Sequence, residues 1–183
     1  MSPHPRAPQQ ELRARLEALL ADCREHGEPP RATLRASLSD ILVFRERHGL
    51  SGLWGASPPL LLTATLDDGF GHGIETAALC ARACGMETRS AGLLAAPEAI
   101  AAAARETGAA LCAVTVLRTD SEEALARLAS LLPPACPLVA GGPAIRHDPA
   151  LAARAGVRHP AATVTDLLAL LLSLAAPAAP RTP

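Results

Sequence analysis

The stretch that decides the fold is residues 60–73, which read LLLTATLDDGFGHG. Its first half, Leu60 to Leu66, is apolar apart from its threonines and is short enough for a buried β-strand. A glycine-rich loop follows, and the helix-forming residues Ile74 to Cys84 then lead to Gly85, which is a helix-stop signal. The stretch therefore predicts one strand–loop–helix unit of the kind that builds a parallel sheet.

The chain after this stretch repeats the same unit. Three further strand–helix pairs are expected at Thr88–Gly92 with Pro97–Thr107, at Ala110–Leu117 with Ser121–Leu132, and at Pro137–Ala140 with Pro149–Ala155. A last short strand near Val157–His159 precedes a helix at Val164–Leu174. Five strands that alternate with helices predict an α/β fold, namely a doubly wound five-stranded parallel sheet of the flavodoxin-like or Rossmann-like type.

Two amphipathic helices are expected before the sheet. One spans Glu11–His26 and is followed by Gly27, and the other spans Arg31–His48. Both place leucines at helical spacing, so each has one apolar face to bury.

The expected domain boundaries follow from these segments. Residues 11–50 would form a helical arm or cap, an N-terminal helical extension of the α/β domain at residues 59–175. The two ends, residues 1–10 and 176–183, are rich in proline and are expected to be disordered.

The composition excludes several classes of function. The formal net charge is −1, and the 17 basic residues are all arginines spread along the chain, so direct binding to nucleic acid is not expected. One Trp, two Phe and no Tyr leave little aromatic surface for stacking bases. The apolar run Leu167–Ala175 is too short to span a bilayer and the N-terminus has no signal-peptide core, so we expect no membrane partner and a cytoplasmic location.

The loops indicate a ligand site at one edge of the sheet. Unusual segments stand at the ends of the first, third and fourth strands, at residues 67–73, Thr115–Leu117 and Gly141–Pro143. In an open parallel sheet such loops meet where the strand order reverses, and ligands bind there. The chain contains no Lys, which excludes a Walker-type phosphate loop, and Gly69-x-Gly71-x-x-Ile74 lacks the third glycine of a dinucleotide fingerprint.

These three segments together resemble the cobalamin-binding fold of mutase small subunits and corrinoid methyl-carrier proteins. The signature of that family is D-x-H-x-x-G, then S-x-L, then G-G. This chain has Asp68-Gly69-Phe70-Gly71-His72-Gly73, then Thr115-Val116-Leu117, then Gly141-Gly142. The resemblance extends from about Pro59 to Ala175 and reproduces the order of strands and helices in the family.

The resemblance implies a cobalamin cofactor whose nucleotide tail enters a slot between the first and third strands while the corrin ring rests on the loops. Gly73 would open the slot, Thr115 would hydrogen-bond the buried base, and Gly141-Gly142 would let the tail pass. Leu66, Val116 and Leu117 would line the slot. The implied cofactor-binding residues are Asp68, Gly69, Phe70, Gly71, His72, Gly73, Ile74, Thr115, Leu117, Gly141 and Gly142.

The sequence departs from the family at the cobalt ligand. Phe70 occupies the position of the histidine that ligates cobalt from below, and a benzyl group cannot coordinate a metal. Asp68 would orient that histidine as a hydrogen-bond partner and here lacks this role. His72 is an alternative metal ligand, since imidazole binds cobalt and iron well. It is equally interpreted as a solvent-exposed loop residue, and Phe70 as an apolar floor beneath a cobalt that has no protein ligand.

Three hypotheses for function remain open on the sequence. The first is a corrinoid-binding small subunit or carrier for a partner mutase or methyltransferase, with the partner protein contacting the N-terminal helices and the chain not catalytic alone. The second is a sensor or regulatory module that holds cobalamin or haem. The third is a degenerate, partner-binding domain without a cofactor, which predicts that side chains such as Phe70 and Leu117 plug the slot.

Overall fold

A computed structural model describes residues 7–175 and contains a five-stranded, all-parallel sheet with the strand order β2-β1-β3-β4-β5. The strands are β1 (Leu60–Thr65), β2 (Glu87–Gly92), β3 (Leu111–Thr115), β4 (Leu138–Gly141) and β5 (His159–Ala161). The order reverses between β1 and β3, as expected of a doubly wound sheet. The predicted fold class is therefore confirmed.

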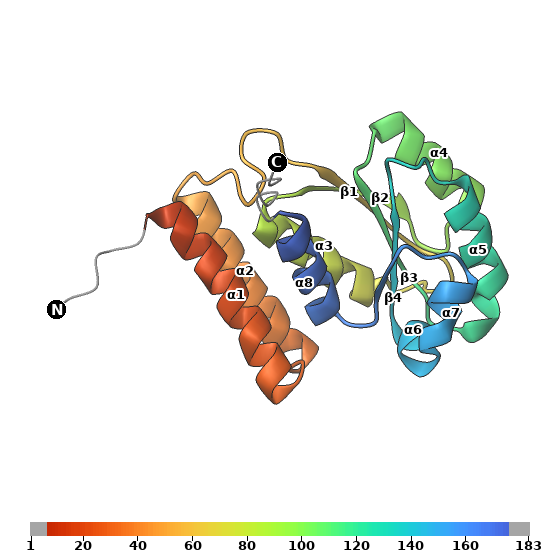
Figure 1. The fold of residues 1–183 in the computed structure, drawn as a ribbon, viewed down its shortest axis with the longest axis horizontal. Helices are drawn as coiled ribbons and strands as arrows, with labels where there is room; N and C mark the ends of the chain where they lie inside the picture. The colour runs from red at the N-terminus through yellow and green to blue at the C-terminus, as the bar shows by residue number, and fades with distance from the viewer. Residues whose placement is uncertain (1–6, 176–183) are drawn as a thin grey trace, which may run out of the picture.

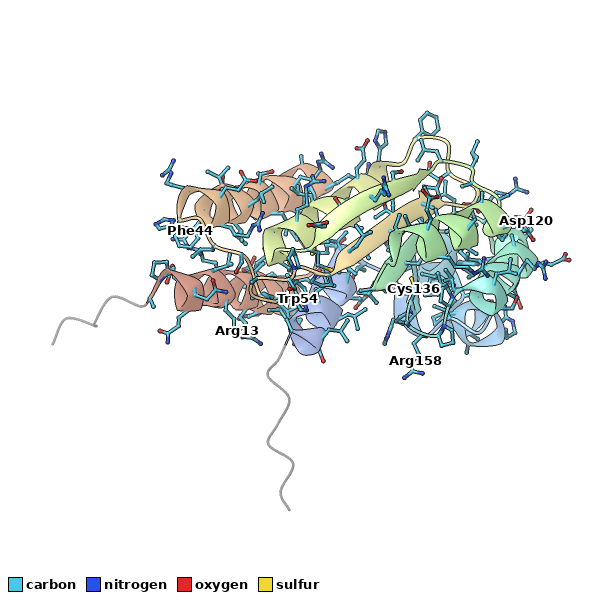
Figure 2. All side chains as sticks on the ribbon, turned by 90° about the horizontal axis from the view of Figure 1, so that it is seen from above. Arg13, Phe44, Trp54, Asp120, Cys136 and Arg158 are labelled. Carbon is cyan, nitrogen blue, oxygen red and sulfur yellow. The ribbon has the colours of Figure 1, made fainter. Side chains whose placement is uncertain are left out.

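Helices cover both faces of the sheet (Figure 1). One face carries α3 (His72–Cys84) and α8 (Val164–Leu174), and the other carries α4 (Pro97–Thr107), α5 (Glu122–Leu131), α6 (Pro143–His147) and α7 (Pro149–Arg154). Each face has its own hydrophobic core. In Figure 2, Phe44 and Trp54 lie toward one end of the molecule, and Cys136 and Asp120 lie toward the other.

The N-terminal helices α1 (Pro8–His26) and α2 (Arg31–Arg47) pack against α3 and α8. Leu12, Leu16 and Leu38 are fully buried in the same core as α3. The helices α1 and α2 therefore lie on the outer side of α3 and α8, and their apolar faces are buried against these two helices.

The first helix begins earlier than the sequence analysis expected. Pro8 occupies the first turn of α1, where its missing N–H is not needed, so residues 8–10 are helical rather than disordered. The Gln9 side chain donates a hydrogen bond to the Gly52 carbonyl at 2.6 Å and anchors this end. The other residues expected to be disordered, 1–6 and 176–183, lie outside the described part of the chain.

The strand boundaries differ from expectation by one or two residues, and the largest differences are at β3 and β5. β3 ends at Thr115, so Val116 and Leu117 belong to the following loop, and β5 starts at His159 because it pairs with β4 from there. Ser121 does not cap α5; its hydroxyl donates instead to Asp67 at 2.8 Å.

Within residues 7–175, no helix combines the length and the apolar composition that a membrane crossing requires.

Candidate ligand-binding site

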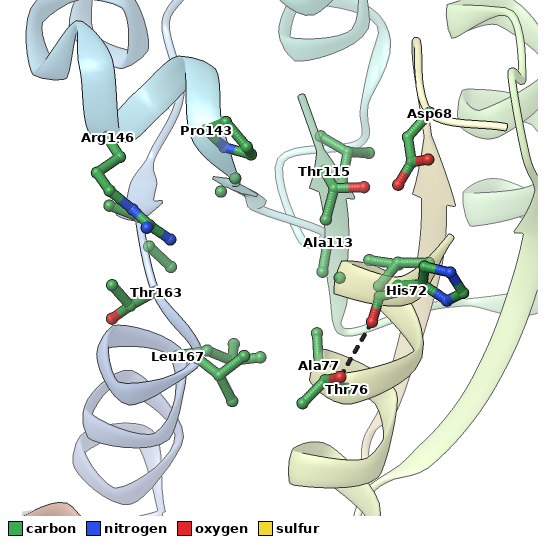
Figure 3. Close-up of a pocket in the computed structure, with 18 of the residues that line it drawn as sticks. Asp68, His72, Thr76, Ala77, Ala113, Thr115, Pro143, Arg146, Thr163 and Leu167 are labelled. Carbon is green, nitrogen blue, oxygen red and sulfur yellow. Dashed lines mark hydrogen bonds between the residues drawn. The ribbon is translucent and has the colours of Figure 1, made fainter. Parts of the chain in front are cut away.

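A cavity of about 420 Å³ opens at the carboxyl edge of the sheet, on the face that carries α3 and α8 (Figure 3). Its floor is formed by the ends of β3, β4 and β5, and its walls by the first turns of α3 and α8. The turn between α1 and α2 and the start of α2 close the outer side. Glu28, Arg31 and Leu34 come from this segment.

The cavity exists because the strands lose side-chain volume toward their carboxyl ends on this face. Alternate residues of a strand face the same side, and on β3 these run from Leu111 through Ala113 to Thr115. On β4, Val139 is followed by Gly141, and β5 contributes Ala161. Small residues at the end of each strand leave space that α3 and α8 do not fill.

The inner part of the cavity is apolar. Ala77 of α3 faces Leu167 of α8 across it, and Ala113 and Val139 form the floor. Such a lining favours a flat, uncharged group and disfavours a free charge.

Thr115 provides a polar group at this apolar site. The residue is only 9% exposed, and its hydroxyl oxygen is buried without a hydrogen-bond partner among residues 7–175. Figure 3 shows the hydroxyl directed toward the side of the cavity that holds Asp68 and His72. A buried hydroxyl without a partner costs about 1–3 kcal/mol, so the site is suited to a ligand that supplies one.

Gly73 lets the start of α3 approach Thr115. A Cβ atom at Gly73 would lie 3.2 Å from the Thr115 methyl carbon, which is tight but involves only a side chain. Its backbone conformation is open to other residues, so the reason for glycine here is space next to the cavity. The role that the resemblance implies for Gly73 toward a ligand stays a prediction.

Gly141 and Gly142 have a different reason to be glycine. A Cβ at Gly141 would lie 2.1 Å from the Ala161 carbonyl oxygen, and one at Gly142 would lie 2.7 Å from the Val116 carbonyl oxygen. Gly142 also has a φ of +104°. The expectation that these glycines serve passage of a ligand is incomplete, because the backbones of the neighbouring strand and loop already require them.

Two adjacent carboxylates shape the loop between β1 and α3. Asp67 accepts hydrogen bonds from the backbone N–H groups of Leu117 and Arg118 and from the Ser121 hydroxyl, each at 2.8 Å. Asp68 is buried, and its carboxylate accepts from the Phe70 N–H at 2.8 Å. Asp67 therefore fastens the loop after β1 to the loop after β3, and Asp68 holds a turn that projects Phe70.

Phe70 and His72 lie on the outer rim. Phe70 is 79% exposed, and its ring is stacked near that of His72 with centroids 6.1 Å apart. His72 is the first residue of α3, is exposed, and in Figure 3 its imidazole points away from Arg146 and Thr163. Among residues 7–175, no cluster of three or more His, Cys, Asp or Glu side chains could hold a metal ion.

The rim of the site is apolar and open. Phe70, Leu93, Leu94 and Leu117 are exposed, and all four lie in loops that follow the carboxyl ends of β1, β2 and β3. Leu94 has a φ of +50°, which is rare for a leucine. Because Phe70 and Leu117 are exposed beside an open cavity, the plugged slot that the degenerate-domain hypothesis predicts is absent from the described residues.

The structure brings most of the predicted residues together. Those that line the cavity are Asp68, Phe70, His72, Gly73, Ile74, Thr115, Leu117, Gly141 and Gly142. Gly69 and Gly71 do not line it; Gly71 has a φ of +72° and allows the turn into α3.

The structure corrects the predicted position of the slot. Val116 and Leu66 pack in the core on the other face of the sheet, so they do not line the cavity. The cavity lies over β3, β4 and β5, between the first turns of α3 and α8, rather than between β1 and β3 (Figure 3).

Several lining residues were missed by the sequence analysis. They come from α2, α6 and the start of α8: Arg31, Leu34, Arg146, Thr163 and Leu167. A signal was present for Thr163, since Thr163 and Asp166 have capping-box spacing and the cap fixes where α8 starts. No local pattern marks Arg31 or Leu34, because their position depends on how α1 and α2 pack on the domain.

Comparisons with known proteins agree on the fold. No protein-family model matches the sequence, and no curated protein matches it. Among solved structures, a cobalamin-binding protein from Desulfitobacterium hafniense DCB-2 is similar with a TM-score of 0.76, 14% identity, and coverage of 89% of this chain and 80% of that one. The monomethylamine corrinoid protein of Methanosarcina barkeri is similar with a TM-score of 0.56 and the same identity and coverage. At this identity, the likeness shows a shared fold.

Proposed function

We propose that this chain binds a corrinoid of the cobalamin class and presents it to a protein partner. The observation that carries the proposal is the unpartnered, buried hydroxyl of Thr115 in an apolar cavity at the carboxyl edge of the sheet. The two similar structures support it, since one is named for binding cobalamin and the other for its corrinoid.

The residues present fit the nucleotide tail of such a ligand. A cavity of about 420 Å³ is too small for a whole corrinoid but within the usual range for a ligand the size of a drug molecule. The uncharged lower base would occupy the apolar part between Ala77 and Leu167, and Thr115 would offer it a hydrogen bond from the side of the cavity that holds Asp68 (Figure 3). The corrin ring would lie outside, on the exposed rim formed by Phe70 and Leu117.

We propose that the cobalt has no protein imidazole beneath it. Phe70 offers a flat apolar surface at this position, and the imidazole of His72 stacks near Phe70 with its ring away from α6 and α8. Asp68 retains a structural role without a histidine partner, because its carboxylate already holds the turn at Phe70.

Catalysis would need a partner. A bound corrinoid supplies the chemistry of a carbon–cobalt bond, and this chain's own residues around the cavity bind and orient the ligand. The partner would approach at the carboxyl edge, where Phe70, Leu93, Leu94 and Leu117 are exposed. The N-terminal helices are less suited to hold it than the sequence analysis expected, because their apolar faces are buried against α3 and α8.

The first test is an absorption spectrum after incubation with hydroxocobalamin, adenosylcobalamin or, separately, haem, followed by desalting. We expect a retained corrinoid spectrum of the form in which the lower base is not bound to cobalt. A protein that stays colourless would overturn the proposal. Retention of haem alone would favour the sensor hypothesis instead.

Two variants sharpen this test. Gly73→Val places a branched side chain against Thr115 and should abolish retention, while Ala78→Val on the same helix, away from the cavity, should not. His72→Ala should leave the corrinoid band positions unchanged. A shifted spectrum in His72→Ala would instead assign His72 as a cobalt ligand.

A further inference from the structure

Two guanidinium groups border the cavity, Arg31 from α2 and Arg146 from α6. Among residues 7–175, the Arg146 side chain makes no ion pair and no hydrogen bond. This sets it apart from its neighbours at the same end of the molecule. Arg118 pairs with Asp120, and Arg154 pairs with both Glu122 and Asp148.

The fold directs Arg146 at the cavity. It lies on α6, the short helix that follows Gly141-Gly142, and its backbone N–H donates to the Gly142 carbonyl at 3.1 Å. Ala144 and Ile145 are buried, which fixes the helix against the core of the other face. The Arg146 side chain is left on the open side, and Figure 3 shows its guanidinium reaching toward the cavity above Thr163.

Glu28 and Thr163, which also border the cavity, already have hydrogen-bond partners. Glu28 accepts hydrogen bonds from the N–H and the hydroxyl of Thr165, both at 2.9 Å. The Thr163 hydroxyl is used in the capping box with Asp166. Arg31 likewise makes no ion pair among residues 7–175, but it comes from the same segment as Glu28, which has the opposite charge. Arg146 has no carboxylate on its own segment among the residues that line the cavity.

The polarity of the lining changes along the cavity and indicates where a charged part of the ligand would lie. The inner part, at Ala77 and Leu167, is apolar and suits an uncharged base, while the outer rim at Phe70 and Leu117 suits a macrocycle. Arg146 lies on the α6 side of the cavity, above Thr163 and across from Asp68 and His72 (Figure 3). In a corrinoid with a complete nucleotide tail, the group between base and ring is a phosphodiester, which carries one negative charge.

We propose that Arg146 binds the phosphodiester of the ligand's nucleotide tail and so selects complete corrinoids over those that lack the nucleotide. This inference rests on the proposed function. Guanidinium groups bind phosphate oxygens through paired, charge-assisted hydrogen bonds, which lysine reproduces only as a point charge. Arg146→Lys should therefore fall between the natural protein and Arg146→Ala.

The test measures affinity by spectroscopic titration for hydroxocobalamin and for cobinamide, which lacks the nucleotide and its phosphodiester. Arg146→Ala should weaken hydroxocobalamin binding by about tenfold or more and leave cobinamide binding unchanged. It should also reduce the dependence of hydroxocobalamin binding on salt concentration. Arg158→Ala, an exposed arginine at the opposite edge of the sheet (Figure 2), is the matched control and should change neither affinity.

The outcomes separate this inference from the proposed function. If the natural protein binds neither corrinoid, both fail. If it binds hydroxocobalamin and Arg146→Ala binds it equally well, only the assignment of Arg146 fails. An equal loss for hydroxocobalamin and cobinamide, or a loss in Arg158→Ala as large as in Arg146→Ala, also overturns it. Far-ultraviolet circular dichroism of each variant shows whether the fold is intact, and Arg146→Lys provides the second variant if Arg146→Ala is not.

Discussion

The two faces of the sheet are built from similar residues but differ in how side chains pack at the carboxyl edge. The face under α4 and α5 has a closed core whose largest side chains are buried: Ile100, Leu125, Leu128, Ile145 and Leu151. The open hollow at its carboxyl edge lies outside this core, between the loop after β3 and α6. The face under α3 and α8 is equally well packed near α1, at Leu12 and Leu16, but holds a cavity at the carboxyl edge. The apolar cavity under α3 and α8 results from the omission of side-chain volume at the strand ends on that face.

The strands show the same difference within single segments. On β3, the side chains toward α4 and α5 are Cys112 and Val114, with Val116 following in the loop, while those toward the cavity are Ala113 and Thr115. The period of two along a strand lets one segment specify a solid face and a hollow one. The comparison predicts that substitutions on the two faces have different consequences.

The largest expected difference is between leucines on opposite faces. Leu128→Ala should cost about 3–4 kcal/mol of unfolding free energy, because it opens a new void in a filled core. Leu167→Ala should cost about 1–2 kcal/mol, because Leu167 borders an existing cavity and few contacts are lost. Urea denaturation of both variants measures this. Equal costs would break the comparison, since they would mean that the cavity face is as tightly packed as the other.

Two glycines beside the cavity are expected to differ in how much the stability of the fold depends on them. Gly141→Ala should cost about 3 kcal/mol, at the upper end of overpacking effects, because its Cβ would meet the Ala161 carbonyl oxygen at 2.1 Å. Gly73→Ala should change stability by less than about 1 kcal/mol, since only the Thr115 methyl group must give way and alanine favours a helix. Thermal unfolding of the two variants measures this difference in stability. If Gly141→Ala is as stable as Gly73→Ala, the backbone reason for Gly141 is wrong.

The same glycines show how far the sequence could lead. The strand order, the helices and the sheet edge at which the cavity opens were predictable, because period, helix stops and the edge rule are local or topological signals. Gly73 and Thr115 line the cavity, as the sequence predicted, and their roles toward a ligand stay predictions. The backbone reason for Gly141 was not predictable, because the atom that it must avoid belongs to Ala161, on another strand, and no pattern along one segment encodes that distance.

The packing of the N-terminal helices could not be predicted from the sequence for a related reason. Amphipathic helices must bury one face, but their leucines do not say against what. The structure places α1 and α2 on α3 and α8, which brings Arg31 and Leu34 to the cavity. Arg146 was missed likewise, because its place beside the cavity depends on how α6 packs on the sheet and not on its neighbours along the chain.

Asp67 tests how the open rim of the cavity face is held. Asp67→Ala removes the acceptor of three hydrogen bonds, from Leu117, Arg118 and Ser121, and should cost about 2 kcal/mol. Amide hydrogen exchange should increase in residues 116–121 and not in α4, which lies on the other face. Unchanged exchange in residues 116–121 would mean that the loop is held by other contacts.

Thr115 gives a prediction in which stability and binding change in opposite directions. Thr115→Val replaces an unpartnered, buried hydroxyl with a methyl group, so the free protein should gain about 1 kcal/mol. Hydroxocobalamin affinity should fall about tenfold, because the ligand loses its hydrogen bond. Val114→Thr, on the other face of the same strand, is the matched control and should be destabilising, since its hydroxyl would enter an apolar core. Lower stability in Thr115→Val would show that the hydroxyl is already paired in the free protein.

The smallest effect is expected on the filled face, at the surface ion pairs of α7. Arg154 lowers the pKa of Glu122 and of Asp148 by hydrogen bonding to both carboxylates. Groups whose pKa is lowered by folding stabilise the protein above their unfolded pKa, near 4, and this contribution is lost as the pH falls through the folded values. Arg154→Ala should therefore lower the midpoint of thermal unfolding slightly at about pH 7 and not at all at about pH 2, where the carboxylates are protonated. High salt should shrink the difference at neutral pH, because these side chains are partly exposed. A difference that persists at low pH would mean that Arg154 acts through packing of its aliphatic part rather than through charge.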